Sequence, residues 1–254
     1  MVLSQAAPVA TPRQSMLDRS LAMQLAATEY DRFADALRTL SPEEWSLPTD
    51  CPAWDVRALA GHVLGMAEMA ASMRETIRQN WTASRRGGLY IDALTSLQVE
   101  KHANRSPQEI VDRFVDVGPR AARGRTRTPR LLRRSRMPAE QPVGTTLEPW
   151  TFGYLLDVIL TRDTWMQRVD LAQAVGRPVV LTAEHDGVLV ADVVAEWAQR
   201  HGQSCTLTLS GPAGGHWSFG HGARPHLELD AVGFCRILSS RGSGPGLLSV
   251  QVPF

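Results

Sequence analysis

Residues 161–170, TRDTWMQRVD, read as the middle of an amphipathic helix that places polar side chains on its apolar face. Asp163, Gln167 and Asp170 are spaced i, i+4 and i+7, so one side of a helix carries all three. Leu156, Ile159 and Met166 fall near the same side and should point into a core. A carboxylate and an amide that point into a core each need a polar partner there.

His62 is the partner that the sequence offers. Its neighbours on the same helical face are apolar, namely Leu59, Met66, Met69 and Met73, so the imidazole should point into a bundle. One interpretation is a core histidine that is hydrogen-bonded to a partner. The other pairs it with Asp163 across the bundle. One ligand from one helix and an i, i+4 pair from a facing helix form metal sites in bundles, and three protein ligands with an open position are typical of catalytic ones.

Gln167 limits the metal interpretation, since an amide oxygen is a weak ligand for zinc or nickel. Asp170 has two interpretations as well. It either supports a metal ligand from behind or forms a buried ion pair with Arg168 or Arg57 that stabilises the bundle.

The wider pattern predicts a mixed α and α/β chain. Helical periodicity predicts bundle helices over residues 16–40, 52–79, 90–103, 107–123 and 151–175. An arginine-rich loop should follow the fourth, to about residue 146. After Pro178 we expect a helix at 183–201, strands at 204–211 and 225–230 with a short strand or hairpin between them, a helix from Asp230 and a last strand at 247–254. The predicted organisation is a disordered tail (1–15), a helical bundle (16–177) and a small α+β domain (178–254).

Bulk composition excludes several classes of protein. The 254 residues are 43% hydrophobic with a net charge of +1, so nothing in the overall charge favours nucleic acid or a membrane as partner. Three scattered cysteines form no disulfide framework. The N-terminus lacks the pattern of a signal peptide, and no apolar run reaches the roughly 20 residues of a membrane span. We therefore expect a cytoplasmic protein.

Three other features have competing interpretations. The arginine-rich segment 120–136 is either a nucleic-acid arm, a solvated loop, or the source of an arginine that holds a carboxylate substrate. His216, His221 and His226, with Glu228 and Asp230, are a metal patch or ordinary exposed residues of strands. Cys51 is either a small residue packed beneath Trp54 or a thiol whose pKa is lowered by a helix N-terminus.

Two segments of the chain resemble the mycothiol-dependent maleylpyruvate isomerase family, within the wider DinB-like superfamily. The first segment, residues 40–68, has the family's pattern at Trp45, Pro48, Thr49, Cys51, Pro52, Trp54, Val56, Arg57, Leu59 and His62. The second has it at Asp163, Gln167, Asp170, Ala174 and Gly176. The end of the chain, from Glu228, is similar to the C-terminal domain of many relatives.

This resemblance implies a DinB-like four-helix bundle followed by a small α+β domain. It also implies a divalent metal, usually zinc, at the positions of His62, Asp163 and Gln167. In the family the metal activates the thiol of mycothiol, which adds to a conjugated double bond, allows rotation and leaves. An arginine of the C-terminal domain should reach the mouth of the active site, and the candidates are Arg224, Arg236 and Arg241.

The chain departs from the family at two of the three ligand positions, with Asp163 in place of glutamate and Gln167 in place of histidine. Three hypotheses follow. The first is a metal- and thiol-dependent isomerase or transferase that acts on a conjugated or acidic metabolite with mycothiol or another low-molecular-weight thiol. The second is a metal-free enzyme in which His62 and Asp163 act as an acid/base pair. The third is a protein that binds a small ligand without turnover.

Overall fold

The computed structural model describes residues 11–222 and 224–254. Most of the tail predicted for residues 1–15 lies outside this part. Its end is held against the body of the molecule, because the Arg13 amide donates to the Pro149 carbonyl at 2.8 Å and the Thr151 amide donates to the Arg13 carbonyl at 3.0 Å. No helix within the described ranges has both the length and the apolar character that crossing a bilayer requires.

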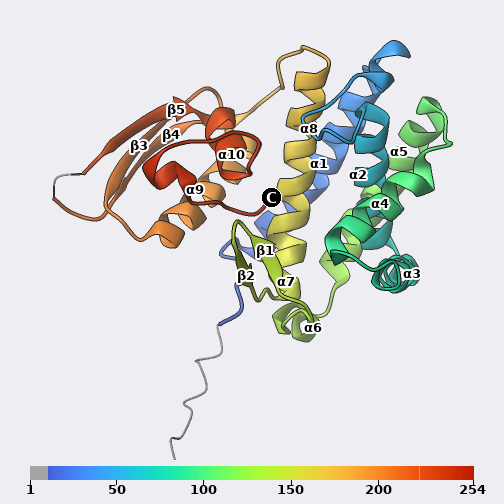
Figure 1. Cartoon of the computed structure of the whole chain (residues 1–254), viewed down its shortest axis with the longest axis horizontal. Coiled ribbons are helices and arrows are strands. Elements are labelled where there is room, and N and C mark those ends of the chain that lie inside the picture. The colour runs from blue at the N-terminus through green and yellow to red at the C-terminus, as the bar shows by residue number, and fades with distance from the viewer. Residues whose placement is uncertain (1–10, 223) are drawn as a thin grey trace, which may run out of the picture.

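Four helices form the bundle that the sequence predicts (Figure 1): α1 (Arg19–Arg38), α2 (Val56–Ala71), α5 (Pro107–Arg127) and α8 (Leu160–Ala174). Each packs against two of the others, with α2 between α5 and α8 and α1 between the same two. Their shared core includes Phe33, Leu59, Leu64, Phe114 and Leu171, each at most 2% exposed. The predicted start of α5 is confirmed, since Ser106 and Glu109 form a capping box before it.

The prediction of one helix over residues 52–79 is wrong. The chain breaks at Ser72, whose backbone is extended (φ −146°, ψ 118°), and a second helix, α3 (Met73–Ser84), starts there. The Ser72 hydroxyl accepts a hydrogen bond from the Glu75 amide and so caps α3. Because α3 turns away, Met73 is 67% exposed and does not share the buried face of His62. Helix α4 (Tyr90–His102) then packs against α2 and α3.

The arginine-rich segment is helical and partly buried, which corrects the prediction of a loop. Helix α5 continues to Arg127, and the short helix α6 (Arg130–Arg134) follows. Arg125 is 1% exposed and donates to the carbonyl of Leu156 and to the hydroxyl of Thr161. That carbonyl lies in a one-turn π-helix (Leu155–Ile159), where the helical hydrogen bonds are rearranged. Arg125 therefore satisfies an acceptor that the π-helix leaves free.

A small hairpin also lies in the segment predicted to be a loop. It pairs β1 (Gln141–Val143) with β2 (Thr146–Glu148). The short helix α7 (Phe152–Tyr154) and the π-helix then lead without a break into α8. The helix predicted over residues 151–175 is thus present as one continuous rod.

The C-terminal part is a three-stranded sheet covered on one face by two helices (Figure 1). The strands are β3 (Cys205–Ser210), β4 (Gly215–Phe219) and β5 (His226–Asp230), in the order β4-β3-β5, with β3 antiparallel to β4 and parallel to β5. Helix α9 (Val188–His201) follows a π-turn (Ala183–Gly187), and α10 (Ala231–Leu238) follows β5. The predicted last strand is absent: the chain forms a 3-10 turn (Gly246–Ser249) and an extended end in which Val252 is buried.

Helix α8 lies between the other bundle helices and the C-terminal part. Residues 161–171 are buried at every position except Asp163. One hydrophobic cluster joins Leu25 of α1 and Trp165, Met166 and Val169 of α8 to the cores of α9, β3 and α10. The domain boundary near residue 177 remains a prediction, because this core runs across it.

Candidate functional site

His62 lies in the middle of α2 and is 5% exposed. Asp55 caps the start of this helix by accepting a hydrogen bond from the Ala58 amide at 2.8 Å. The preceding loop folds back on itself, so that the Trp54 indole lies over the imidazole with the ring centroids 5.0 Å apart. Trp54 thus forms one wall around His62.

A chain of amides orients the His62 ring. Oε1 of Gln98 lies 2.9 Å from Nδ1 of His62, while Nε2 of Gln98 donates to Oε1 of Gln79 at 3.0 Å. Gln79 in turn donates to the Gly65 carbonyl at 3.1 Å. Since an amide oxygen can only accept, Nδ1 of His62 carries the proton. Nε2 is therefore the atom that His62 presents to the bundle interior.

Gly65 permits this arrangement because α2 and α4 approach closely there. A Cβ atom at position 65 would lie 2.6 Å from Cβ of Gln98, closer than side chains tolerate. Glycine on α2 thus lets Gln98 reach His62. A lone glutamine and a lone glycine give no signal in the sequence, and neither residue was predicted as part of the site.

Asp163 and Gln167 of α8 face His62, as the helical spacing predicts. Nε2 of His62 lies 3.4 Å from Oδ2 of Asp163, and Nε2 of Gln167 donates to Oδ1 of Asp163 at 3.3 Å. Burial raises the pKa of the Asp163 carboxyl, but His62 in its protonated form, followed by the Gln167 amide and the charge of Arg241, outweighs burial and holds that pKa below its ordinary value. Asp163 is therefore a carboxylate at neutral pH.

Two oxygens of this group are buried without a hydrogen-bond partner among the described residues: Oδ2 of Asp163 and Oε1 of Gln167. With the proton on Nδ1, a neutral His62 directs a lone pair from Nε2 at Oδ2, so two acceptors face each other. Such a contact requires either a proton on Nε2 or a cation between the two atoms.

The donor set fits a divalent cation. Two ligands at bond lengths of about 2.0–2.1 Å in tetrahedral geometry lie about 3.3 Å apart, which matches the 3.4 Å between Nε2 of His62 and Oδ2 of Asp163. Oε1 of Gln167, which is buried without a partner among the described residues, would be a third and weaker donor. The Gln98 contact to the far nitrogen is the outer-shell hydrogen bond that metal-binding histidines usually make.

Two arginines of the C-terminal part reach Asp170 on α8, seven residues after Asp163. Nε of Arg241 donates to Oδ2 of Asp170 at 2.6 Å, and Arg236 donates to Oδ1 of Asp170 at 2.9 Å and to Asp50 at 2.8 Å. The charge of Arg241 also acts on Asp163 and helps to lower the pKa of its carboxyl. Arg241 is thus near Asp163, and Arg236 shares its carboxylate partner Asp170, whereas Arg224 donates to the carbonyls of Phe219 and Gly220 at the end of β4.

The expected partners of Asp170 are wrong. Arg57 donates to the carbonyl of Arg105, and Arg168 points to the opposite side of α8. A carboxylate that is fully buried needs close cationic partners, and the C-terminal part supplies Arg236 and Arg241 instead. The spacing of residues within the bundle helices could not predict these contacts, because both arginines lie in the C-terminal part.

The structure does not support an activated thiol at Cys51. The side chain is half-buried, and burial raises the pKa of the thiol, with the charge of Arg241 opposing that effect. Asp170 and Asp163 act in the same direction as burial. Cys51 is therefore a neutral thiol at neutral pH.

A second cluster of metal-ligand types, Glu29, His185 and Asp186, was not predicted from sequence. Its charges are already compensated. Arg168 donates to Oε1 of Glu29 at 2.7 Å and to Oδ1 of Asp186 at 2.6 Å, and His185 lies 2.7 Å from Oε2 of Glu29. Arg32 also pairs with Asp186. This cluster is a buried ion-pair network that ties α1, α8 and the start of α9 together.

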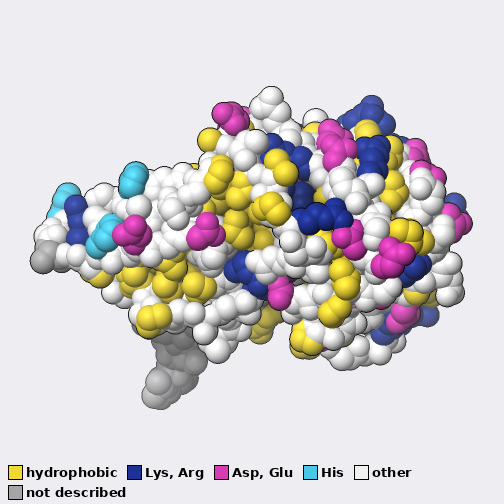
Figure 2. All heavy atoms as spheres, turned by 90° about the horizontal axis from the view of Figure 1, so that it is seen from above, with side chains coloured by type: hydrophobic (Ala, Val, Ile, Leu, Met, Phe, Trp, Pro, Cys, Tyr) yellow, Lys and Arg dark blue, Asp and Glu magenta, His cyan; other side chains and the backbone are white. Residues whose placement is uncertain are grey.

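The histidines of the sheet do not converge on a common point. His226 contacts Thr206 and His216 contacts Thr208, on the exposed face of the sheet. Figure 2 shows histidine side chains at the sheet end of the visible face, and acidic and basic side chains interspersed over the bundle end. Neither observation favours the metal patch.

The fold and the site together define a DinB-like helical-bundle protein with an appended α+β unit. Residues 26–172 match the family described as Mycothiol maleylpyruvate isomerase N-terminal domain. The chain belongs to this family, which confirms the resemblance seen in the sequence.

Two solved structures have a similar fold: the mycothiol-dependent maleylpyruvate isomerase and a histidine-to-alanine mutant of it. They are 16% and 15% identical to this chain, each with a TM-score of 0.56, and the alignments cover 89% of this chain and 91% of theirs. The likeness at this identity concerns the fold. No curated protein sequence matches the chain.

Proposed function

We propose that the protein is a small-molecule enzyme of the thiol-dependent isomerase or thiol-transferase type, with a divalent cation, zinc in the first instance, held by His62, Asp163 and Gln167. The observation that supports the proposal is the pair of orphaned oxygens on Asp163 and Gln167 opposite Nε2 of His62. Family membership supports the choice of mycothiol, or another low-molecular-weight thiol, as co-substrate.

The roles of the residues follow from their contacts. His62 and Asp163 supply the strong donors, and Gln98 keeps Nε2 of His62 free of its proton. A bound divalent cation lowers the pKa of a coordinated thiol, so that the thiolate is present at neutral pH. Trp54 packs against the His62 ring.

Arg241 is the residue that we assign to substrate recognition. Its Nε is bound to Asp170, but its two terminal nitrogens have no partner among the described residues. The Arg241 side chain is 17% exposed, and its terminal nitrogens are not among the buried atoms that lack a partner, so a ligand can reach them. A planar guanidinium with two free donors suits a carboxylate. This supports a conjugated acid as the substrate class.

Elemental mass spectrometry on protein purified without an affinity tag tests the proposal. We expect close to one equivalent of a divalent metal in the wild type, its loss in His62→Ala, and its retention in the control His216→Ala on the exposed sheet face. Thiol-dependent turnover of conjugated acids should depend on the same metal. A protein that stays free of metal after incubation with zinc would overturn the proposal.

A second candidate function is supported by the weak third ligand. His62 and Asp163 are close enough for an acid/base pair if Nε2 carries a proton. This candidate is a metal-free enzyme that uses the same side chains. It predicts turnover that survives a chelator and is lost in both His62→Ala and Asp163→Asn, whereas the first proposal predicts loss of turnover with the chelator alone.

A further inference from the structure

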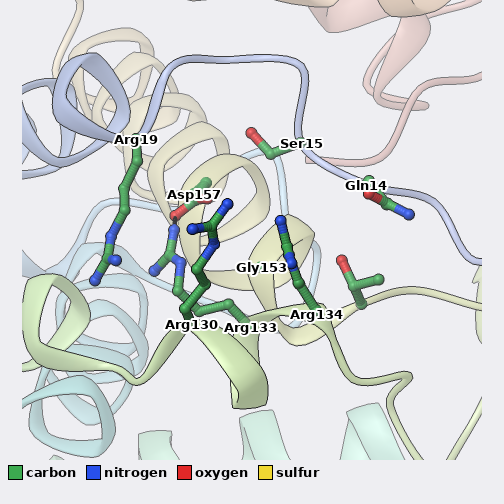
Figure 3. A pocket seen from close by; sticks show the side chains of 9 residues that line it. Gln14, Ser15, Arg19, Arg130, Arg133, Arg134, Gly153 and Asp157 are labelled. Atoms are coloured by element: carbon green, nitrogen blue, oxygen red, sulfur yellow. Dashed lines mark hydrogen bonds and ion pairs between the residues drawn. The ribbon is translucent and has the colours of Figure 1, made fainter.

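A pocket lies where the N-terminal segment crosses α6 and α7, and His62, Asp163 and Gln167 are not among the residues that line it. Its volume is about 410 Å³, in the range of small-ligand pockets. Its wall is formed by nine residues, which are Gln14, Ser15, Arg19, Arg130, Arg133, Arg134, Thr151, Gly153 and Asp157. Figure 3 shows the arginine side chains around this space, with Arg19 reaching in from α1 and the other three from α6.

The charge of this pocket is strongly positive. Four arginines and one aspartate line it, so the lining carries a formal charge of +3, although the chain as a whole carries only +1. Arg130 and Arg134 are exposed and have no hydrogen bond or ion pair with any described residue. Their guanidinium groups are therefore available to a ligand.

The floor of the pocket is a built structure. Arg133 and Asp157 form an ion pair in which each side chain is only 7% exposed. Gly153 lets α6 rest on α7, since a Cβ at that position would lie 2.9 Å from the Arg133 carbonyl oxygen. Arg19 is held at the rim by hydrogen bonds to the carbonyls of Thr126 and Thr128. These contacts hold Arg19 and Arg133 in place before any ligand arrives, and they leave Arg130 and Arg134 free to turn towards it.

We propose that this pocket binds a phosphate-bearing small molecule at a site separate from the one around His62. Guanidinium groups bind phosphate oxygens through paired, planar hydrogen bonds. An excess charge of +3 suits a multiply charged anion better than a monocarboxylate. Asp157 is occupied by Arg133, so it leaves Arg19, Arg130 and Arg134 to meet the anion.

Isothermal titration calorimetry with inorganic pyrophosphate at constant ionic strength tests this site. We expect the wild type to bind pyrophosphate and Arg130→Gln/Arg134→Gln to bind it about ten-fold or more weakly. The control Arg74→Gln/Arg85→Gln removes the same two charges from α3, outside the pocket, and should bind within about two-fold of the wild type. His62→Ala should bind as the wild type does, because the two sites are separate.

Three results would overturn the inference. The first is a wild type that does not bind pyrophosphate. The second is equal weakening in the control pair, which would mean that overall charge and not the pocket attracts the anion. The third is citrate binding as tightly as pyrophosphate, which would remove the assignment to phosphate. Circular dichroism of each variant shows whether the fold is retained, which the exposure of both arginines leads us to expect.

Discussion

Oε1 of Gln98 lies 2.9 Å from Nδ1 of His62, and this contact sets the chemistry of the far side of the imidazole ring. Because the glutamine oxygen accepts, the ring proton stays on Nδ1, and the lone pair of Nε2 points towards Asp163. Gln98 is itself held by Gln79, so the orientation is built into the packing of α2, α3 and α4.

Replacing Gln98 by leucine should weaken metal binding by about 10- to 100-fold, since the loss of an outer-shell partner has this effect at other histidine sites. A competition titration of the zinc-loaded protein against a chromophoric chelator measures the change. The exposed glutamine of α5 provides the control, and Gln108→Leu should leave the affinity as it is. Unchanged affinity in Gln98→Leu would show that the contact does not serve a metal ligand.

Replacing Gln167 by histidine should strengthen metal binding by about ten-fold or more, because imidazole is a better ligand than an amide oxygen for zinc. The matched control is Gln173→His, an exposed position on the same helix. Retention of zinc during dialysis against chelator measures the difference between the two variants. If both variants lose zinc equally, Gln167 does not face the ion and the proposed ligand set is incorrect.

Glu29→Gln should destabilise the protein by about 3–5 kcal/mol without changing its metal content. The change leaves Arg168, which is 4% exposed, with only Asp186 as a carboxylate partner, and breaking a buried pair from one side has a cost of this size. Urea unfolding and elemental analysis of the same sample test both parts. A loss of bound metal in this variant would identify Glu29, His185 and Asp186 as the metal site.

The bundle could be predicted from sequence because its helices have regular apolar spacing and clear ends, such as the capping box at Ser106. The facing of His62 and Asp163 followed from the same spacing. The break at Ser72 could not be seen, since apolar residues continue on both sides of it. In the sequence, Arg125 belongs to a run of arginines that suggests a solvated segment. Only the tertiary structure shows that its guanidinium is buried and donates to the Leu156 carbonyl.

The contacts of Asp170 illustrate the same limit. Helical spacing identified Asp170 as a buried carboxylate, but its partners come from residues more than 60 positions away. A single bundle helix contains no information about which arginine of a later segment will reach it. Partners that depend on how α10 packs against α8 are therefore available only from the three-dimensional structure.

Asp170→Asn should lower the free energy of unfolding by about 1–3 kcal/mol, because it removes the shared carboxylate of Arg236 and Arg241, while burial, which raises the pKa of that carboxyl, offsets part of the gain. Asp50→Asn is the control at the exposed end of the same network, with an expected cost of about 0–1 kcal/mol. Thermal or urea unfolding followed by circular dichroism compares the two variants. Equal effects would mean that Asp170 does not anchor the C-terminal arginines.

Glu68 should contribute to the acid sensitivity of the protein, together with Glu75, whose carboxyl pKa is lowered as well. Burial raises the pKa of the Glu68 carboxyl. Hydrogen bonds from His102, Lys101 and Arg113 outweigh burial, so the pKa falls from its ordinary value of 4.5 to about 2. The folded state therefore binds the proton less readily than the unfolded state does. The resulting stability is complete above about pH 4.5 and is lost as the pH falls from there towards 2.

Glu68→Gln should accordingly destabilise the protein by about 2–3 kcal/mol at pH 7 and flatten the dependence of stability on pH between about 4.5 and 2. Urea unfolding at a series of pH values measures both effects. Glu100→Gln serves as the control, since Glu100 is 59% exposed and pairs only with Arg86 among the described residues. A slope in Glu68→Gln as steep as that of the wild type would assign the acid sensitivity to other carboxylates.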